Sequence, residues 1–366
     1  MPIKLHVTKE KILDGLQKIQ NVVSVRSTLP ILSNTLLIAE KDGLCLTATD
    51  LDVGIRCRIA AEVLKQGSAT VPCRKLFSIL RELPSQDFDL EVDEKNTMSL
   101  RSGGSFFRIL GLPAEEFPRF PSFPEIKEIK IDQSVLRSLL KRTAYAASTD
   151  DTRFVLNGVF WSFKAEKLTM VATDGRRLAL AEAELAHPVS SEMEFILPSK
   201  AVSELSRLLA DAGDACIRVT ENQILFELGD SILASKLVEG VFPNFRQVIP
   251  SDSKERIKIE RESLLAALHR VSILVSERQN AVKLNFSKNS LSISASAPEV
   301  GEAKESLPIN YKGKDISIGF NPQFLMDPLR NLDADEVIME LTDELSPGVL
   351  KIDAPFLYVI MPMRLN

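Results

Sequence analysis

Histidine, tryptophan and the common catalytic motifs are scarce or missing in this chain. It has three histidines, His6, His187 and His269, and one tryptophan in 366 residues. The histidines lie far apart in the sequence, which disfavours a zinc site or a His-based triad. The sequence has no G-x-S-x-G, H-E-x-x-H or G-x-x-x-x-G-K-[ST] motif. We therefore expect no enzymatic activity, no cofactor and no metal site.

Cysteines and long apolar runs are also few. The four cysteines, Cys45, Cys57, Cys73 and Cys216, form no C-x-x-C pair, which favours free buried thiols in a reducing compartment. No stretch of about 20 apolar residues could form a membrane-spanning helix. The first residues, "MPIKLHVTKEKIL", are charged and do not have the pattern of a signal peptide. These features predict a cytoplasmic protein that has no membrane partner.

Positive charge is in deficit overall but concentrated in a few segments. The net charge of −5 argues by itself against a nucleic-acid binder. However, the segments with helical apolar spacing hold 14 Lys and Arg residues against six Asp and Glu, so they carry +8 and the remainder −13. Glu suits helices as well as Lys does, so this bias predicts a basic helical surface that attracts phosphate without reading base sequence. These segments are 9–20, 74–82, 133–147, 199–210, 261–271 and 322–331.

A threefold internal repeat is the main feature of the sequence. The segments "ILSNTLLIAEKDGLCLTATD", "FVLNGVFWSFKAEKLTMVATD" and "RQNAVKLNFSKNSLSISASAP" begin at residues 31, 154 and 278. Asn157 lies 123 residues after Asn34, and Asn280 lies another 123 after Asn157. Two further sets of landmarks, Pro72, Pro198 and Pro322, and Val7, Ile131 and Ile259, have nearly the same period. Agreement among three unrelated landmarks indicates three copies of one structural unit.

Each copy predicts an α+β domain with the order strand, helix, several strands, helix, several strands. We place the domains at 1–124, 125–252 and 253–366, with boundaries in the stretches "FPEIKEIK" and "IPSDSKERIK". Thr8 and Asp132 are expected to cap helices, and Asp174-Gly175 to form a turn between two strands. Pro328 should shorten or kink the last helix. The aspartates of "TATD", "ATDG" and Asp150-Asp151 are interpreted as turn and cap residues rather than metal ligands.

Domain size indicates that one chain alone cannot surround DNA. A domain of about 120 residues has a diameter of roughly 35 Å if it is treated as a sphere. Three such spheres in a ring leave a hole of only about 5 Å, whereas six leave roughly 35 Å. A twofold dimer, with the first domain of one chain against the third domain of the other, could therefore encircle a duplex.

The repeat units carry motifs that resemble those of the bacterial DNA polymerase III β subunits, the sliding clamps. The resemblance covers the whole chain and rests on "STLPILSN", "TATDLDV", "VPCRKL", "LNG", "VATDGRRLAL", "SKLVEGVFPNF", "IGFN" and "VIMPMRL". It implies three copies of one clamp domain, with helices lining the inside and antiparallel sheets outside, in a head-to-tail homodimeric ring. The implied function is a processivity factor that encircles duplex DNA and tethers the replicative polymerase.

The resemblance also implies a peptide-binding pocket between the second and third domains. Met side chains are flexible and can receive several different peptides. Arg176, Gln247 and Asn366 depart from the common pattern of the family, which bears on peptide preference. The residues implied for this pocket are Leu156, Thr173, Gly175, Arg176, Leu178, Pro243, Val248, Asn321, Phe324, Leu345, Val359, Met361, Pro362, Met363 and Arg364.

Two further sets of residues follow from the resemblance. Those implied to contact DNA are Arg26, Arg74, Arg137, Lys141, Arg142 and Lys200. Those implied to form the dimer seam are Phe106, Phe107 and Leu110 on one side, and Ile273 and Leu274 on the other. The adjacent aromatics of "SFFRIL" cannot both face their own core, so an edge strand is expected there.

The expected partners are double-stranded DNA, the DNA polymerase III catalytic subunit, a clamp loader, and a second copy of the chain. Other polymerases and repair proteins would dock through a short clamp-binding peptide. A protein-only repeat scaffold is the alternative, and it would keep the pocket but lack the basic helical face. A hydrolase that uses the turn aspartates is a third possibility, and the missing motifs disfavour it.

Overall fold

The computed structural model describes residues 2–23, 29–84, 86–123, 128–189, 191–251, 253–275, 280–298 and 300–364. Within these residues the same order of elements occurs three times. The first copy contains β1 (Ile3–Thr8), α1 (Lys9–Ile19), η1 (Pro30–Ser33), β2 (Asn34–Glu40), β3 (Gly43–Thr49), β4 (Val53–Ile59), β5 (Glu62–Lys65), β6 (Gly67–Pro72), α2 (Cys73–Glu82), β7 (Asp87–Val92), β8 (Thr97–Ser102), β9 (Ser105–Leu110) and η2 (Ala114–Glu116).

The second and third copies repeat this order without the short strand β5. The second contains β10 (Ile129–Asp132), α3 (Gln133–Thr143), η3 (Ala144–Ala146), η4 (Asp151–Leu156), β11 (Gly158–Lys164), β12 (Lys167–Thr173), β13 (Arg177–Glu184), β14 (Met193–Pro198), α4 (Ser199–Leu208), β15 (Asp214–Val219), β16 (Gln223–Leu228) and β17 (Ser231–Lys236). After η5 (Phe245–Val248), the third contains β18 (Glu255–Glu260), α5 (Arg261–Ser272), β19 (Val282–Ser287), β20 (Ser290–Ala297), β21 (Gly301–Pro308), β22 (Ile316–Phe320), α6 (Pro322–Asn331), β23 (Glu336–Leu341), β24 (Gly348–Ile352) and β25 (Ala354–Ile360). The predicted α+β repeat is confirmed.

The chain divides into two compact units, which are described separately here. The first unit comprises residues 1–136 and 203–237. It has a five-stranded sheet, β5-β1-β7-β8-β9, and an eight-stranded sheet, β10-β15-β16-β17-β4-β3-β2-β6. Strands β17 and β4 pair antiparallel, with Leu233 opposite Ile55. The first and second copies therefore share one continuous sheet in this unit.

Helix α1 lies close against the sheet of the first unit. Its buried residues Ile12, Leu16 and Ile19 recur at helical spacing, and the helix packs on β3 and β4 and against α2. A Cβ at Gly15 would come within 2.6 Å of the Leu46 side chain. A larger residue here would force the Leu46 and Ile59 side chains to shift, so glycine favours the close packing even though it lowers helix propensity.

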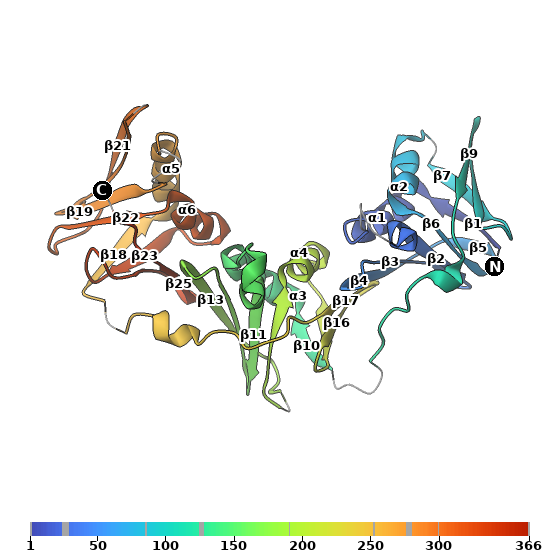
Figure 1. Ribbon diagram of the computed structural model, residues 1–366, viewed down its shortest axis with the longest axis horizontal. Coiled ribbons are helices and arrows are strands. Elements are labelled where there is room, and N and C mark those ends of the chain that lie inside the picture. Colours follow the sequence, from blue (N-terminus) through green and yellow to red (C-terminus); the bar gives the residue numbers. More distant parts are fainter. Residues whose placement is uncertain are drawn as a thin grey trace. The chain divides into compact units, whose positions relative to one another are not determined.

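The second unit comprises residues 137–202 and 238–366. Its sheets are β14-β11-β12-β13-β25-β24-β23-β18 and β21-β20-β19-β22. Strands β13 and β25 run side by side (Figure 1), with Leu178 opposite Val359. Helix α5 packs on β20 and β21 and against α6. The second and third copies therefore share a sheet in the same way as the first and second copies do.

The helix starts follow the capping residues that the sequence predicted. The Thr8 hydroxyl accepts a hydrogen bond from the Lys11 backbone N at 3.5 Å, and Asp132 Oδ1 accepts one from the Ser134 backbone N at 2.7 Å. Both N-caps are confirmed. The Asp174-Gly175 turn is also confirmed, because it joins β12 to β13 with Gly175 at φ +85°.

The predicted shortening of the last helix at Pro328 was wrong, and the alternative, a kink at this residue, stays a prediction. Helix α6 continues through Pro328 to Asn331. A proline in a helix leaves the carbonyl four residues earlier without its N–H donor, and that carbonyl belongs to Phe324. The hydroxyl of Tyr358, on β25, donates a 2.7 Å hydrogen bond to it. A side chain from the neighbouring strand therefore replaces the missing backbone bond.

The substitution Tyr358→Phe should destabilise the second unit by about 1–3 kcal/mol, the cost of a buried acceptor that loses its partner. Tyr358 is fully buried, so water does not easily replace the hydroxyl. Urea unfolding of the purified protein would measure the change in the free energy of unfolding. A loss below about 0.5 kcal/mol would show that the Phe324 carbonyl finds another donor.

Candidate functional site

Residues 361–364, which follow β25 (Ala354–Ile360), are held against the second unit by backbone hydrogen bonds. After β25 the Met361 backbone N donates to the Arg176 carbonyl at 2.9 Å, and the Met363 N donates to the Gly319 carbonyl at 2.8 Å. Pro362, between them, has no N–H to donate. The apolar tail is thus fixed between the turn before β13 and strand β22.

A buried apolar cluster lies beneath this tail. It brings together Leu156, Leu178 and Val359 with the aromatic residues Phe160, Phe242 and Phe245. Phe160 and Phe242 stack with ring centroids 4.9 Å apart. The chain that links the second and third copies is therefore anchored by its own aromatic side chains, and three predicted pocket residues are buried in the same cluster.

Several predicted pocket residues are apolar and exposed. Val248, Leu345 and Met361 are 49%, 80% and 43% exposed. Leu345 lies in the turn before Gly348, which pairs with Ile360 beside the tail. Phe154 and Val241, which the sequence analysis did not assign to the pocket, are exposed apolar residues of the same compact unit.

The remaining predicted pocket residues have local structural roles or lie at the rim. The Thr173 hydroxyl donates to the Arg177 carbonyl at 2.6 Å and accepts from the Gly175 N at 3.1 Å. Asn321 is the N-cap of α6 and accepts from the Gln323 N at 2.9 Å. Pro243, Arg176 and Arg364 are exposed, and Phe324 is half-buried.

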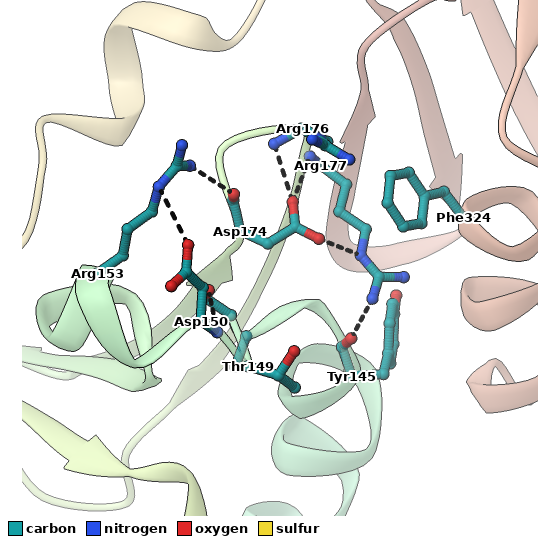
Figure 2. A pocket seen from close by; sticks show the side chains of 10 residues that line it. Tyr145, Thr149, Asp150, Arg153, Asp174, Arg176, Arg177 and Phe324 are labelled. Atoms are coloured by element: carbon teal, nitrogen blue, oxygen red, sulfur yellow. Dashed lines mark hydrogen bonds and ion pairs between the residues drawn. The ribbon is translucent and has the colours of Figure 1, made fainter. Parts of the chain in front are cut away.

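A half-buried arginine, Arg177, which the sequence analysis missed, connects β13 to α6. Arg177 donates to Asp174 Oδ2 at 3.0 Å, to Asp327 Oδ2 at 2.5 Å and to the Tyr145 carbonyl at 2.7 Å. Its guanidinium lies 4.4 Å from the ring centre of Phe324, a cation–π contact (Figure 2). This network fixes the predicted pocket residue Phe324 against the turn that carries Arg176.

Beside this network is a cavity of about 410 Å³ (Figure 2). It adjoins the tail, because Arg176 lines the cavity and also accepts the hydrogen bond from Met361. Its lining residues are Tyr145, Ala147, Ser148, Thr149, Asp150, Arg153, Asp174, Arg176, Arg177 and Phe324.

The predicted DNA-contact residues that the structure describes all lie on helices. Arg74 is exposed on α2, Arg137, Lys141 and Arg142 lie on α3, and Lys200 is exposed on α4. Arg26 lies outside the described residues.

Lys141 already has an acidic partner, which the sequence analysis did not foresee. Its Nζ donates to Asp333 Oδ1 at 2.7 Å and to Oδ2 at 2.9 Å. The hydrogen bond from Lys141, together with the charges of Arg142 and Arg261, holds the pKa of the Asp333 carboxyl below its usual range. The Asp333 carboxylate therefore binds the Lys141 ammonium group, which a DNA phosphate could bind instead.

The predicted seam residues lie at a sheet edge and at a helix end. In the described part of the chain, β9 is the last strand of its sheet. Phe106 and Leu110 on this strand are exposed, and Phe107 is half-buried. Ile273 and Leu274 follow α5 directly, and Ile273 is 71% exposed.

The aspartates of the turns serve as backbone acceptors. Asp50 Oδ1 accepts from the Asp52 and Val53 backbone N atoms at 3.0 and 2.7 Å. Asp174 Oδ1 accepts from the Arg176 and Arg177 N atoms at 2.8 and 3.0 Å. The interpretation of these aspartates as turn residues is confirmed.

The four cysteines are free thiols; three are buried and Cys216 is half-buried. None of the helices in the described ranges is long and apolar enough to cross a membrane.

Comparison with known proteins agrees with this arrangement over the full length. Three family models match: the N-terminal domain of the DNA polymerase III beta subunit at residues 3–121, its central domain at 130–244 and its C-terminal domain at 246–364. The beta sliding clamp of Escherichia coli (strain K12) is 37% identical over 369 residues, with 99% of this chain and 100% of the relative covered. That of Chlamydia muridarum is 33% identical over 364 residues, with both chains fully covered.

Solved structures give the same result. A sliding clamp from Pseudomonas aeruginosa bound to griselimycin is 35% identical, with a TM-score of 0.94 and full coverage of both chains. The DNA polymerase sliding clamp from Bacillus subtilis is 30% identical, with a TM-score of 0.95 and full coverage of both chains.

The fold is that of a DNA clamp, with three copies of one α+β domain. The chain belongs to the DNA polymerase III beta-subunit family, whose members are sliding clamps. The prediction of a processivity clamp is confirmed, and the alternative, a protein-only repeat scaffold, is not supported. The family consists of non-catalytic processivity factors.

Proposed function

We propose that this chain forms a head-to-tail homodimeric ring around duplex DNA and tethers the DNA polymerase III catalytic subunit. The single observation that carries the ring is a pair of sheet edges in the described part of the chain. Strand β9 ends the sheet of the first copy, and β21 ends that of the third copy. Free edges invite pairing with another chain, and a twofold dimer satisfies both edges at once.

The mechanism is topological and requires no cofactor or catalytic residue. A closed ring leaves DNA only when it opens or reaches an end, while weak contacts to phosphates allow it to slide. Tethering raises the effective concentration of the polymerase at the primer end. A separate ATP-driven clamp loader would open the ring, since the sequence has no phosphate-binding loop of its own.

The clamp domains in this proposal span residues 1–124, 125–252 and 253–366. The polymerase, the loader, and other polymerases and repair proteins would dock by short peptides on the tail surface. We define the tail surface as Leu156, Thr173, Gly175, Arg176, Leu178, Pro243, Val248, Asn321, Phe324, Leu345, Val359, Met361, Pro362, Met363 and Arg364. A ring that acts on DNA inside the cell would work in the cytoplasm.

Retention on circular and linear DNA tests encirclement directly. The protein would be loaded with its matching loader and ATP onto nicked circles, the salt raised, and half of the sample cut with a restriction enzyme. We expect retention on circles and rapid loss from linear ends. Equal loss from both would mean binding by charge alone, and the ring would have to be abandoned.

Replacing Arg137, Lys141 and Arg142 together with Ala should weaken binding to short duplex DNA at low salt. Each lost phosphate contact should lower the slope of log K against log salt by about 0.9. Fluorescence anisotropy at several salt concentrations would measure both quantities. The matched variant Asp333→Asn should raise the affinity for DNA, because it releases Lys141 from its carboxylate partner. Unchanged affinity and slope in the triple variant would remove α3 from the DNA surface.

A further inference from the structure

A cavity of about 140 Å³ lies in the first compact unit, where the first and second copies share a sheet. Its walls are the turn 49–54 between β3 and β4, the segment 118–121 that follows η2, and residues 234–236 at the end of β17, together with Gln223 of β16. We call it the first-junction cavity. Every residue that lines it belongs to the first unit, whereas the tail surface belongs to the second. It is therefore a separate site and not an extension of the tail surface.

The backbone around the first-junction cavity repeats the framework that holds the tail. The Lys236 backbone N donates to the Asp52 carbonyl at 2.8 Å, as the Met361 N does to the Arg176 carbonyl at 2.9 Å. The side chains differ, because Lys236 Nζ forms an ion pair with Asp52 Oδ1 at 2.9 Å. The first junction therefore has the same backbone arrangement as the tail surface, with an ion pair in the place of Arg176 and Met361.

The chain segment that covers this junction also has its counterpart at the tail surface. The motif Phe-Pro-x-Phe occurs at 117–120 and again at 242–245. Pro118 lines the first-junction cavity, and the proline of the second motif belongs to the tail surface. The ring centre of Phe120 lies 4.4 Å from the guanidinium of Arg56 on β4, a cation–π contact. This contact anchors the segment to the sheet beside the cavity.

Leu51 is a strained residue in the wall of the cavity. Its side chain is 46% exposed and its φ is +80°. Residues with a Cβ rarely adopt this angle, and Leu has no polar side chain that stabilises the turn by a local hydrogen bond. The matching turn of the second copy has Gly175 at φ +85°, where glycine causes no such strain. A strained residue that keeps an exposed apolar side chain points to a function of that side chain.

The size and charge of the cavity define what it can bind. A volume of about 140 Å³ suits one compact apolar group, since an apolar cavity of about 150 Å³ holds a benzene molecule. At the rim, Lys236 and Asp52 neutralise each other. Arg119, also at the rim, is exposed and forms no hydrogen bond or ion pair with any residue in the described part of the chain. The site therefore offers room for one aliphatic side chain and one unpaired positive charge beside it.

We propose that the first-junction cavity is a second docking site, which binds a partner protein segment through one aliphatic side chain and an adjacent Asp or Glu. The aliphatic side chain is removed from water against Leu51 and Pro118. The carboxylate accepts charge-assisted hydrogen bonds from the Arg119 guanidinium. Because the tail surface stays free, one chain holds two partner segments at once.

The test selects peptides from a random dodecapeptide display library on the full-length protein, with counter-selection on Leu51→Gly. This variant should fold with an undiminished melting temperature, because glycine suits a φ of +80°. Peptides that survive the counter-selection, here called first-junction peptides, should carry an aliphatic residue next to Asp or Glu. Fluorescence polarisation should show that Leu51→Gly weakens them by about tenfold or more.

The charged contact is tested on the same peptides. Arg119→Gln, a change of an exposed side chain, should weaken them about tenfold, the effect of one partly exposed charge-assisted bond. The change of the peptide's acid to its amide should cost the same. The two changes together should cost no more than either one alone, because they remove the same interaction.

The matched control is Leu345→Gly, which removes an exposed leucine of the tail surface. It should change the affinity of first-junction peptides by less than about twofold. It should weaken the tail peptides, which we define as selected peptides that bind Leu51→Gly as tightly as the wild type and depend on Leu345.

The outcomes separate this site from the proposed docking on the tail surface. If every selected peptide bound Leu51→Gly as tightly as the wild type, the second site would be overturned and docking on the tail would stand. First-junction peptides that ignored Arg119→Gln would overturn the acidic partner. First-junction peptides without any tail peptides would support the second site and count against docking on the tail. If no peptide were selected, both proposals would fail.

Discussion

Deletion of residues 361–366 is expected to abolish the binding of tail peptides and to leave the dimer intact. The deletion removes Met361 and Met363, and full burial of such a side chain by a partner contributes about 1.5–3 kcal/mol. Losing both should weaken binding by more than about 100-fold. In the described part of this segment, residues 361–364, the backbone hydrogen bonds go to Arg176 and Gly319 in the second unit and not to β9 or β21. Fluorescence polarisation with the tail peptides and sedimentation equilibrium would measure the two properties.

Point substitutions separate the side chains of the tail from its backbone. Met361→Ser with Met363→Ser keeps both backbone hydrogen bonds and removes only the apolar surface, so it should reproduce most of the loss. If this double variant bound peptides normally while the deletion did not, the backbone of the tail and not its methionines would carry the interaction. A deletion variant that became monomeric would show that the tail also supports the seam.

The fold was largely predictable because three copies of one pattern reinforce one another. Each helix was recognised from apolar spacing, and the observed bounds, such as Lys9–Ile19 and Arg261–Ser272, differ from the predicted ones by a few residues at most. Pro328 was misjudged because the sequence does not show which carbonyl a distant side chain can reach. Tyr358 lies 34 residues from Phe324, and only the packing of β25 beside α6 brings its hydroxyl within range.

The apolar tail could be recognised from the sequence, whereas the ion pairs beside it could not. The apolar residues near the end of the chain, "VIMPM", can be recognised in the sequence. The resemblance to the family supplied the other pocket residues. The pair Arg177–Asp327 joins residues 150 apart, and Lys141–Asp333 joins residues 192 apart. A charge pattern indicates that a helix face is basic, but it does not indicate which lysine has an acidic partner.

The substitution Leu110→Asp or Ile273→Asp should convert the proposed dimer into monomers. Both side chains are exposed in the single chain, at 73% and 71%, so neither change should disturb folding. Burying an unpaired carboxylate in an apolar seam costs several kcal/mol, which should raise the dimer dissociation constant more than about 100-fold. Sedimentation equilibrium over a range of protein concentrations would measure it.

The matched control is Leu64→Asp, on β5 at the opposite edge of the same five-stranded sheet, which should leave the dimer unchanged. Peptide binding and retention on circular DNA should then respond differently to the seam substitutions. The seam variants should still bind peptides, because the whole tail surface lies within one compact unit of the chain, but they should lose retention on circular DNA. If Leu110→Asp and Ile273→Asp stayed dimeric, the assigned seam would be wrong. If they were monomeric and still retained on circles, encirclement by a dimer would be excluded as the reason that the protein stays on DNA.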